Sequence, residues 1–367
     1  MCGIPRSALV FGASRLSSAS LVSRPRNRNT SPSGMPGRRP AIPAKRNTAP
    51  SPSPCILFPV ILVFGTICLD RLRRVPRLPA LGGYTEVEDE ALLLGGEAAN
   101  TANALVKWGR QVILAGNGIG VGPDADLLGE LLSDKGLHDS LLTIANGCSD
   151  EGNEPTPVCD IYVTPDGERT MFGRGFSTMK PKFELKSLPF AKDGWFTAEP
   201  NMAEPSRQVA KAASEAGMRC YLMDFVGDDE PIGPGSFWQS STDWAGFRNN
   251  TQKNVQWVKS WIARHRCFTI LSDGPNGFVA GSPEMPARAY PPYPTPTVVD
   301  TTGAGDMFRA GMLFGLDQGW PTSKCLQFAS AAGCLKCRAL GATTDVPSMD
   351  EVLGYVAEHA QVSRQYL

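Results

Sequence analysis

The chain has 367 residues, with 36 Lys and Arg residues, 36 Asp and Glu residues and a hydrophobic fraction of 42%. The formal charge of zero combines two unlike parts, because residues 1–54 hold nine basic and no acidic residues, which leaves 27 basic and 36 acidic residues in 55–367. An acidic segment has no excess of cations with which to neutralise the phosphates of a nucleic acid. We therefore expect no nucleic-acid partner for 55–367, whose length and apolar content suit one large domain or two ordinary ones.

The first 54 residues are rich in Arg, Ser, Pro and Gly and show no sustained hydrophobic period. A segment of this composition buries too little apolar surface to offset its chain entropy, so we predict a disordered N-terminal extension over 1–54. Arg- and Ser-rich segments without acidic residues are also typical of organelle transit peptides. The alternatives are a plain extension and a start site upstream of the true one. The expected location is the cytoplasm, or a plastid or mitochondrion if the extension is a transit peptide.

The most apolar run of the sequence is Cys55–Leu69. Its 15 residues are fewer than the roughly 18–20 that a membrane-spanning helix needs. The run contains Pro59, Gly65 and several β-branched residues, which together favour a fully buried parallel strand. No other run is long enough to span a bilayer, so we expect no membrane partner.

Downstream of this run, apolar stretches alternate with amphipathic stretches as far as residue 360. The stretches with strand character are 60–64, 111–115, 194–198, 219–223, 267–271 and 277–280. The stretches with a helical period are 98–108, 124–135, 206–216, 252–264, 305–317, 324–338 and 349–359. This alternation predicts an α/β fold, a three-layer sandwich in which helices flank both faces of a mostly parallel central sheet. Ligand sites in such sheets lie beyond the carboxyl ends of the strands.

Two stretches interrupt the alternation. Residues 159–172 are typical of a hairpin, because Pro165-Asp166-Gly167 supplies turn chemistry between two β-rich arms. A second β-like stretch lies near Leu81–Leu94. Small antiparallel pieces attached to a large α/β body predict a lid, with boundaries near 71–94 and 157–178. Residues 225–250 are rich in Pro, Gly, Ser and Asn, show no clear element and are expected to form a long surface connection.

The strongest chemical signal is the string Asp300-Thr-Thr-Gly-Ala-Gly-Asp306, which follows a Pro-rich connector and precedes an apolar helical run. The string should therefore open a helix, where small residues let the backbone amides of Gly303, Ala304 and Gly305 approach an anion. Amides beside a carboxylate suit the transfer of a phosphoryl group to a hydroxyl group. The amides stabilise the charge of the migrating group, and Asp306 takes the hydroxyl proton. The sequence holds no Walker-type phosphate loop.

Residues 300–306 closely resemble the C-terminal signature of the PfkB, or ribokinase-like, carbohydrate kinases, and Gly95–Asn103 resembles their N-terminal signature. The similarity extends over residues 56–350. It implies that 55–367 form a ribokinase-like kinase domain that includes the β lid. The implied reaction is the transfer of the γ-phosphoryl group of ATP to the hydroxymethyl group of a sugar.

The resemblance also implies roles for single residues. Asp306 would be the catalytic base, and the anion hole would be formed by Gly303, Ala304 and Gly305. The residues implied in sugar binding are Asp70, Gly95, Gly96 and Asn100. The residues implied in ATP binding are Gly274, Gly277 and Thr302.

The cofactors implied by the resemblance are ATP and Mg²⁺, with K⁺ as a monovalent cation. Asp300 and Thr302, together with the turn Arg338–Ala342, resemble the cation loop of the family. The hairpin around Asp166–Arg169 resembles one half of the lid that closes over the sugar. In this family the lid often forms a dimer interface, so the resemblance implies a homodimer, with a sugar and ATP as small-molecule partners.

Several features depart from the family pattern. Cys68 stands where ribokinases carry a sugar-binding Asn, and Glu97 replaces a common Lys or Gly. The Asn-x-x-Glu motif that helps to order Mg²⁺ has its nearest counterpart in Asn249–Gln252, where Gln supplies no negative charge. The sugar is therefore not assigned, and two alternatives stay open: a non-catalytic binding or scaffold protein of this family, and a nucleoside kinase of the same fold. Glu199 either faces the sugar or simply ends a strand.

Overall fold

The computed structural model describes residues 60–137, 155–181, 184–295 and 297–367. The extension predicted for 1–54 and the start of the apolar run at Cys55 lie outside the described residues. Among the helices that the structure does describe, none combines the length and the apolar character needed to cross a membrane.

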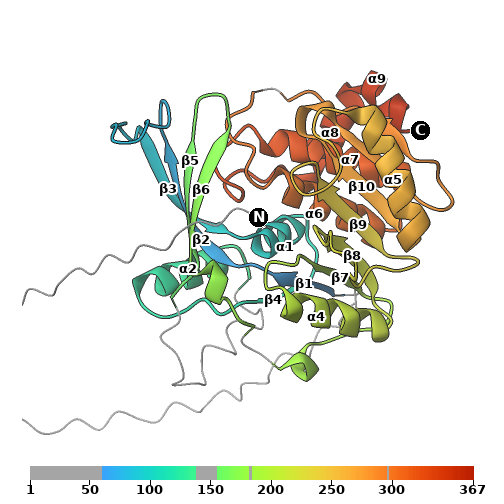
Figure 1. The fold of residues 1–367 in the computed structure, drawn as a ribbon, viewed down its shortest axis with the longest axis horizontal. Helices are drawn as coiled ribbons and strands as arrows, with labels where there is room; N and C mark the ends of the chain where they lie inside the picture. The colour runs from blue at the N-terminus through green and yellow to red at the C-terminus, as the bar shows by residue number, and fades with distance from the viewer. Residues whose placement is uncertain (1–59, 138–154, 182–183, 296) are drawn as a thin grey trace, which may run out of the picture. The chain divides into compact units, whose positions relative to one another are not determined.

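The centre of the fold is an eight-stranded sheet (Figure 1). Its strands, in spatial order, are β12 (Arg288–Tyr290), β11 (Phe278–Gly281), β10 (Phe268–Ser272), β9 (Phe237–Ser241), β8 (Arg219–Met223), β7 (Trp195–Ala198), β1 (Ile61–Gly65) and β4 (Val112–Gly116). The strands from β4 to β10 run parallel, and β11 and β12 are antiparallel additions at one edge. The predicted, mostly parallel sheet is thus confirmed.

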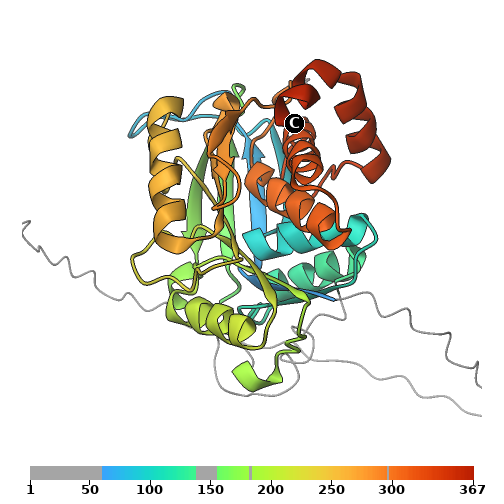
Figure 2. The ribbon, with the colours of Figure 1, turned by 90° about the vertical axis from the view of Figure 1, so that its right-hand side faces the viewer.

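Helices cover both faces of this sheet, as Figure 2 shows. One layer contains α1 (Glu97–Lys107), α2 (Pro123–Asp134), α6 (Ala304–Asp317), α7 (Thr322–Lys336), α8 (Met349–Glu358) and α9 (Ala360–Ser363); the other contains α4 (Glu204–Glu215) and α5 (Thr251–His265). The side-chain alternation of β1 explains the two layers. Ile61 and Val63 join the core with α1 and α6, whereas Leu62 and Phe64 join the core with α4.

A second sheet of four strands lies where the sequence predicts the lid, and it is called the lid sheet below (Figure 1). Its strands, in spatial order, are β3 (Asp89–Gly95), β2 (Cys68–Arg74), β5 (Val158–Val163) and β6 (Arg169–Arg174). β5 and β6 are the predicted hairpin, and Gly167 in its turn has a φ of 80°, which favours glycine. Leu72, Ile161 and Val163 form a small core on one face of this sheet and pack with Leu340 of the main body.

The apolar run Cys55–Leu69 contains more than the one predicted strand, because all of β1 and the first two residues of β2 lie within it. Two side chains from distant segments fix the bend between these strands. Glu199 accepts a hydrogen bond from the N–H of Thr66, and Asn117 accepts one from the N–H of Ile67 at 2.9 Å. The bend therefore depends on contacts that the local sequence does not encode.

Two other expectations were wrong in part. The strand expected near Leu81–Leu94 is confined to β3, which begins at Asp89. Residues 225–250 are more than a surface connection, because they contain β9, one of the central strands of the sheet.

Candidate active site

The signature string begins α6, as its composition predicts. Gly303 is the N-cap residue with a φ of 77°, and a Cβ atom there would lie 2.5 Å from the Cβ atom of Ala342. Glycine is therefore required at this position. The N–H of Ala304 donates to the backbone oxygen of Thr301 at 3.2 Å. The N–H of Gly305 lies in the first turn, where a helix offers it no acceptor, so this end of α6 is suited to bind an anion.

Asp306 lies in the first turn of α6 and is only 6% exposed. Its Oδ2 atom accepts a hydrogen bond of 2.9 Å from Nδ2 of Asn100 on α1, which joins the two signatures in space. Its Oδ1 atom lies 3.4 Å from Nη2 of Arg309, one turn further along α6. Burial raises the pKa of Asp306, and the charge of Arg309 and the Asn100 hydrogen bond oppose that rise. The carboxyl group is thus held between an amide and a guanidinium group.

Arg309 is completely buried among acidic side chains. Its Nε atom donates to Oγ1 of Thr101 at 2.8 Å, and its Nη2 atom donates to the backbone oxygen of Glu97. Besides Asp306, three carboxyl groups have a pKa that burial raises and that the charge of Arg309 lowers: Glu97, Glu199 and Asp224. For Asp224 the result is a pKa of about 6. The charge of Arg309 therefore lowers the pKa of several buried carboxyl groups at once.

Asp70 and Gly95 are diagonal neighbours on the lid strands β2 and β3, where Gly95 pairs with Cys68 and Asp70 with Leu93. A Cβ atom at Gly95 would lie 2.1 Å from the carboxyl group of Asp70, which is itself 4% exposed. The thiol of Cys68 donates to Oδ1 of Asp70 at 3.3 Å. Burial raises the pKa of Asp70 to about 7; the Cys68 hydrogen bond opposes this rise, and the charges of Asp306 and Asp300 add to it. Asp70 is therefore close enough to the signature string to sense its charges.

The bend after β1 places two further residues. Gly96 has a φ of 95°, and a Cβ atom there would lie 2.3 Å from the backbone oxygen of Thr66. Glu199 follows β7, is fully buried, and would lie 2.3 Å from a Cβ atom at Gly65. Its Oε2 atom has no hydrogen-bond partner among the described residues. Glu199 therefore ends its strand and also fixes the bend.

The carboxyl group of Asp300 ties two loops together. Its Oδ1 atom accepts hydrogen bonds from the N–H and the hydroxyl group of Thr302, at 2.9 and 2.7 Å, and its Oδ2 atom accepts one from the N–H of Gly341 at 2.7 Å. The backbone oxygen of Asp300 accepts a hydrogen bond from Nζ of Lys336 at 2.9 Å. The loop that resembles a cation site therefore already holds an ammonium group.

Gly274 and Gly277 form the turn between β10 and β11, with φ angles of 52° and 82°. A Cβ atom at Gly277 would lie 2.2 Å from the backbone oxygen of Tyr290, so the turn requires glycine there. β9 runs beside β10, and Nε2 of Gln239 on β9 donates to the backbone oxygen of Gly305 at 3.0 Å. The Gly274–Gly277 turn therefore follows β10, and the neighbouring strand β9 contacts the start of α6 through Gln239.

The tip of the lid hairpin touches the signature string. Nη1 of Arg169 donates to Oγ1 of Thr301 at 2.8 Å, and this hydroxyl group donates to the backbone oxygen of Gly167 at 3.4 Å. Figure 1 shows the long β5–β6 hairpin that carries these residues. The lid and the start of α6 are therefore in direct contact.

Asn249 and Gln252, predicted as the counterpart of the family's metal motif, lie beside the Gly274–Gly277 turn and at the start of α5. The exact Asn-x-x-Glu spacing occurs instead at Asn201–Glu204, which leads into α4. The N–H of Asn249 donates to both carboxyl oxygens of Asp273, at 3.2 and 3.0 Å, and Gln252 is exposed. Over the residues that the structure describes, no three His, Cys, Asp or Glu side chains are grouped so that they could hold a metal ion. A dedicated metal centre is thus absent from that part of the chain.

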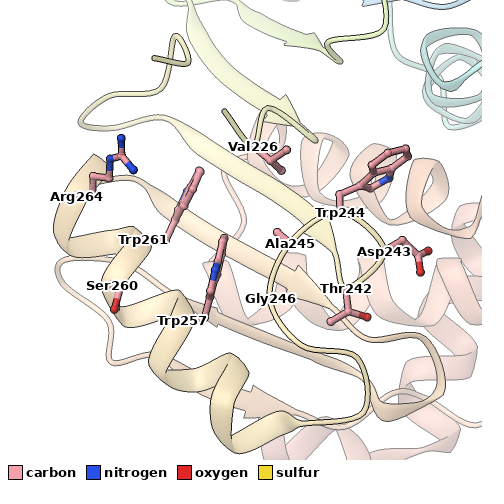
Figure 3. Close-up of a pocket in the computed structure, with 10 residues that line it drawn as sticks. All are labelled: Val226, Thr242, Asp243, Trp244, Ala245, Gly246, Trp257, Ser260, Trp261 and Arg264. Atoms are coloured by element: carbon pink, nitrogen blue, oxygen red, sulfur yellow. The ribbon is translucent and has the colours of Figure 1, made fainter. Parts of the chain in front are cut away.

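A separate pocket of about 610 Å³ lies beside α5 (Figure 3). Trp257 and Trp261 project from α5 into this pocket, and Trp244 and Thr242 line it from the loop after β9. Trp261 also packs on Trp238 of β9, with ring centroids 4.5 Å apart. None of the residues predicted for catalysis or for substrate binding lines the pocket. It is therefore not the site that the two signatures define.

Sequence reasoning missed two charged residues of the site, Arg309 and Lys336. Both lie in the parts of their helices that are mostly buried, Asp306–Gly315 of α6 and Cys325–Lys336 of α7. A lone charge at a position that the helical period buries is the signal that could have identified them, because buried charges need partners. Asp224 and Gln239 were also missed, since they lie around the unrecognised strand β9.

The comparisons with known proteins agree with this architecture. The pfkB family of carbohydrate kinases matches residues 240–349. An uncharacterized sugar kinase of Dictyostelium discoideum is 32% identical, over 80% of this chain and 96% of the relative, and a ribokinase of Arabidopsis thaliana is 27% identical, over 80% of each chain.

Solved structures show the same fold. The A. thaliana ribokinase complexed with ribose and ATP has a TM-score of 0.60 at 22% identity, over 81% of this chain and 98% of that one. A putative ribokinase from Agrobacterium tumefaciens has a TM-score of 0.67 at 18% identity, over 83% of this chain and 99% of that one. At these identities the structures establish the ribokinase fold and leave the substrate open.

Proposed function

Since the chain belongs to the pfkB family of carbohydrate kinases, it is a phosphotransferase with an alcohol group as acceptor, and we propose that it transfers the γ-phosphoryl group of ATP to a hydroxymethyl group of a sugar. The observation that carries this proposal is the hydrogen bond between Asn100 and Asp306 at the start of α6. The bond unites the two signatures in one buried site. A chance resemblance of either string alone would not place them in contact.

Asp306 acts as the base that takes the proton of the attacking hydroxyl group. Asn100 orients its carboxyl group, and burial makes it a stronger base than an exposed aspartate. The charge of the migrating phosphoryl group is stabilised by the dipole at the start of α6 and by the amides of Gly303 and Gly305. The N–H of Ala304, predicted as a third donor, is already hydrogen-bonded to Thr301. These contributions are the positioning and electrostatic effects that phosphoryl transfer requires.

The sugar lies between Asp70 and Asn100, where Gly95 and Gly96 place no side chain. Oδ1 of Asn100 has no hydrogen-bond partner among the described residues. In the same part of the chain, the carboxyl group of Asp70 accepts only from the weak donor Cys68. Both residues therefore offer acceptors to hydroxyl donors. A sugar acid would bring its own carboxylate next to Asp70 and Asp306, so we expect an uncharged polyhydroxyl substrate.

ATP lies against Gly274 and Gly277, with Thr302 near its phosphates. When bound, Mg²⁺ neutralises charge on the ATP phosphates, and it needs few protein ligands because it keeps several waters. The absence of a dedicated metal cluster from the described part of the chain suits a Mg²⁺ ion that arrives with the nucleotide. The residues predicted for K⁺ do not fit this ion, because the ammonium group of Lys336 already lies 2.9 Å from the backbone oxygen of Asp300 and would repel a second cation.

The lid supports a proposal of homodimerisation. Leu92 and Phe172 share the outer face of the lid sheet according to the strand register, and they are 51% and 59% exposed. Large apolar side chains that remain exposed on one face of a sheet are typical of an interaction surface. Sedimentation of the full chain with and without a Phe172→Glu substitution measures this assembly; a wild-type protein that stays monomeric at micromolar concentration contradicts it.

The kinase proposal is tested by ADP formation with the full-length protein over a panel of pentoses, hexoses, keto-deoxy sugar acids and nucleosides. A neutral sugar should be the best substrate, and a nucleoside as best substrate would identify the nucleoside kinase alternative. No ADP above the sugar-free rate with any compound would favour a binding protein without turnover. Asp306→Asn should retain ATP binding and lose about 10²–10⁴-fold in kcat. The matched control is Asp134→Asn, at an exposed position at the end of α2.

A further inference from the structure

Lys336 is a buried cation in the last turn of α7. Its side chain is 1% exposed, although a lysine normally keeps its ammonium group in water. Nζ donates to the backbone oxygen of Asp300 at 2.9 Å and lies 3.5 Å from the backbone oxygen of Ala339. A lysine near a helix end often binds the carbonyl groups of its own helix. Lys336 differs because one of its acceptors belongs to another segment, three residues before the N-cap of α6.

The two loops that receive this ammonium group are the ones that Asp300 also joins. The carboxyl group of Asp300 accepts from Thr302 in its own loop and from Gly341 in the loop after α7. A second link comes from the N–H groups of residues 299 and 300, which both donate to the backbone oxygen of Cys337. The ammonium group therefore lies at the junction of the loops 300–303 and 337–341, among backbone oxygens.

A monovalent cation bound between two such loops would have two effects. It would draw carbonyl oxygens together and so fix the loops, and it would add one positive charge beside the phosphate-binding end of α6. A lysine ammonium group carries the same charge and offers three N–H donors to the same kind of oxygen. Two cations cannot occupy one such place, because their repulsion in a buried site is large.

We infer that the ammonium group of Lys336 is a built-in monovalent cation, which fixes the loop Asp300–Gly303 against the loop 337–341 and makes the protein independent of K⁺. Lys336 is thus a positioning residue, since it acts through Asp300 and Gly303 and not on the substrate. The effect of Lys336 on turnover rests on the proposed kinase function. The effect of Lys336 on the stability of the fold is independent of that function.

The first experiment compares the thermal unfolding of the full-length protein in KCl and in tetramethylammonium chloride at equal ionic strength. The wild-type Tm should differ by less than about 1 °C between the salts, because no site gains an ion. Lys336→Ala removes the ammonium group and leaves the oxygens, so K⁺ or NH₄⁺ should raise its lowered Tm in a saturable way. The control Lys324→Ala, on the same helix with its ammonium group 3.8 Å from the centre of the Trp320 ring, should show no such cation dependence.

The second experiment measures ADP formation in the same salts. The wild-type rate should agree within about twofold between the salts, whereas Lys336→Ala should lose at least about tenfold in tetramethylammonium chloride and regain activity in KCl or NH₄Cl. A wild-type Tm or rate that rises saturably with K⁺ overturns the inference, and so does a folded Lys336→Ala protein that neither K⁺ nor NH₄⁺ stabilises. If the variant fails to fold, the wild-type comparison decides. A wild type without activity on any sugar contradicts the kinase proposal, and the Tm comparison still tests the role of Lys336.

Discussion

The amide nitrogen of Asn100 lies 2.9 Å from Oδ2 of Asp306, although 206 positions separate the two residues in the sequence. α1 and α6 pack against each other and bring them together. The amide oxygen of Asn100 is buried and has no partner among the described residues. One side chain therefore orients the proposed base and offers an acceptor to the proposed sugar.

Asn100→Ala should lower kcat/KM for the sugar by about 10- to 100-fold, which corresponds to the loss of one hydrogen bond to a charged group and one to the substrate. Asn100→Asp should be more damaging, because a second carboxylate beside Asp306 raises the pKa of the pair. Steady-state kinetics with sugar and ATP varied separately will measure both effects. Equal kcat/KM values for wild type and Asn100→Ala would show that Asn100 does not contact the substrate.

Arg309 should set the pH at which activity appears. Its charge lowers the pKa of Asp306, so Arg309→Met should raise that pKa and move the acidic limb of the kcat/KM profile to higher pH. Arg309→Lys keeps a charge and should shift the limb less. The other groups that face the site do not replace Arg309, since Glu97, Glu199 and Asp224 are acids, and the cations Arg169 and Lys336 act more weakly on Asp306.

The measurement is kcat/KM between pH 5 and pH 9 for wild type and both variants, with circular dichroism as the check of folding. Loss of one partner of a buried ion pair costs about 3–5 kcal/mol of stability, so the profiles should be recorded well below the lowest Tm. An acidic limb that stays at the same pH in Arg309→Met would show that Arg309 has only a structural role.

The sequence was sufficient for the helices and for most of the central sheet. Each of the seven predicted helices begins and ends within two residues of the observed bounds, because an amphipathic period and its caps are local properties. β9 was missed because its position in the sheet depends on contacts that are not local in the sequence. Its Gln239 and Ser240 are buried polar residues whose hydrogen bonds go to Gly305 and Asp224, and no local pattern reveals such distant partners.

In the candidate site, too, the residues within local sequence motifs were predicted and those that depend on distant partners were not. Asp306, Gly303 and Asn100 were identified because their strings are contiguous and specific. Arg309 and Lys336 were not, because their importance comes from the acids and the carbonyl groups that surround them in the fold. The bend between β1 and β2 likewise depends on Glu199 and Asn117, which are remote in sequence.

Asp70 should reduce the stability of the folded protein at neutral and alkaline pH. Burial raises its pKa from 3.8 to about 7, so the folded state binds more protons than the unfolded state between these values, and stability falls as pH rises through this window. Asp70→Asn cannot ionise and should remove this loss. The free energy of unfolding of Asp70→Asn minus that of wild type should therefore increase by about 2–3 kcal/mol between pH 5 and pH 8.

Urea denaturation of both proteins at the two pH values will measure this difference. A gain that does not change with pH would mean that Asp70 titrates normally. Sugar binding should weaken in Asp70→Asn at both pH values, because the amide replaces one acceptor oxygen with a donor. Stability and affinity should therefore change in opposite directions, as is common for groups that serve a site.

Gly303 and Gly305 provide a matched pair of substitutions within one signature. An alanine at Gly303 would adopt a φ of 77° and place its Cβ atom 2.5 Å from that of Ala342, whereas the atom nearest to a Cβ at Gly305 is Nε2 of Gln239 at 4.0 Å. The left-handed conformation alone costs about 1–2 kcal/mol, and the clash adds to this cost. Alanine in a helix is instead favoured over glycine by up to about 1 kcal/mol.

Gly303→Ala should therefore lower the free energy of unfolding by more than about 2 kcal/mol, and Gly305→Ala should leave it unchanged or raise it slightly. Both variants should lose kinase activity, because a methyl group at either position obstructs the approach of a phosphoryl group to the backbone. Denaturant midpoints and ADP formation separate the two effects. Full activity in the stable Gly305→Ala protein would show that the phosphoryl group does not approach the first turn of α6, and the proposed anion hole would then have to be abandoned.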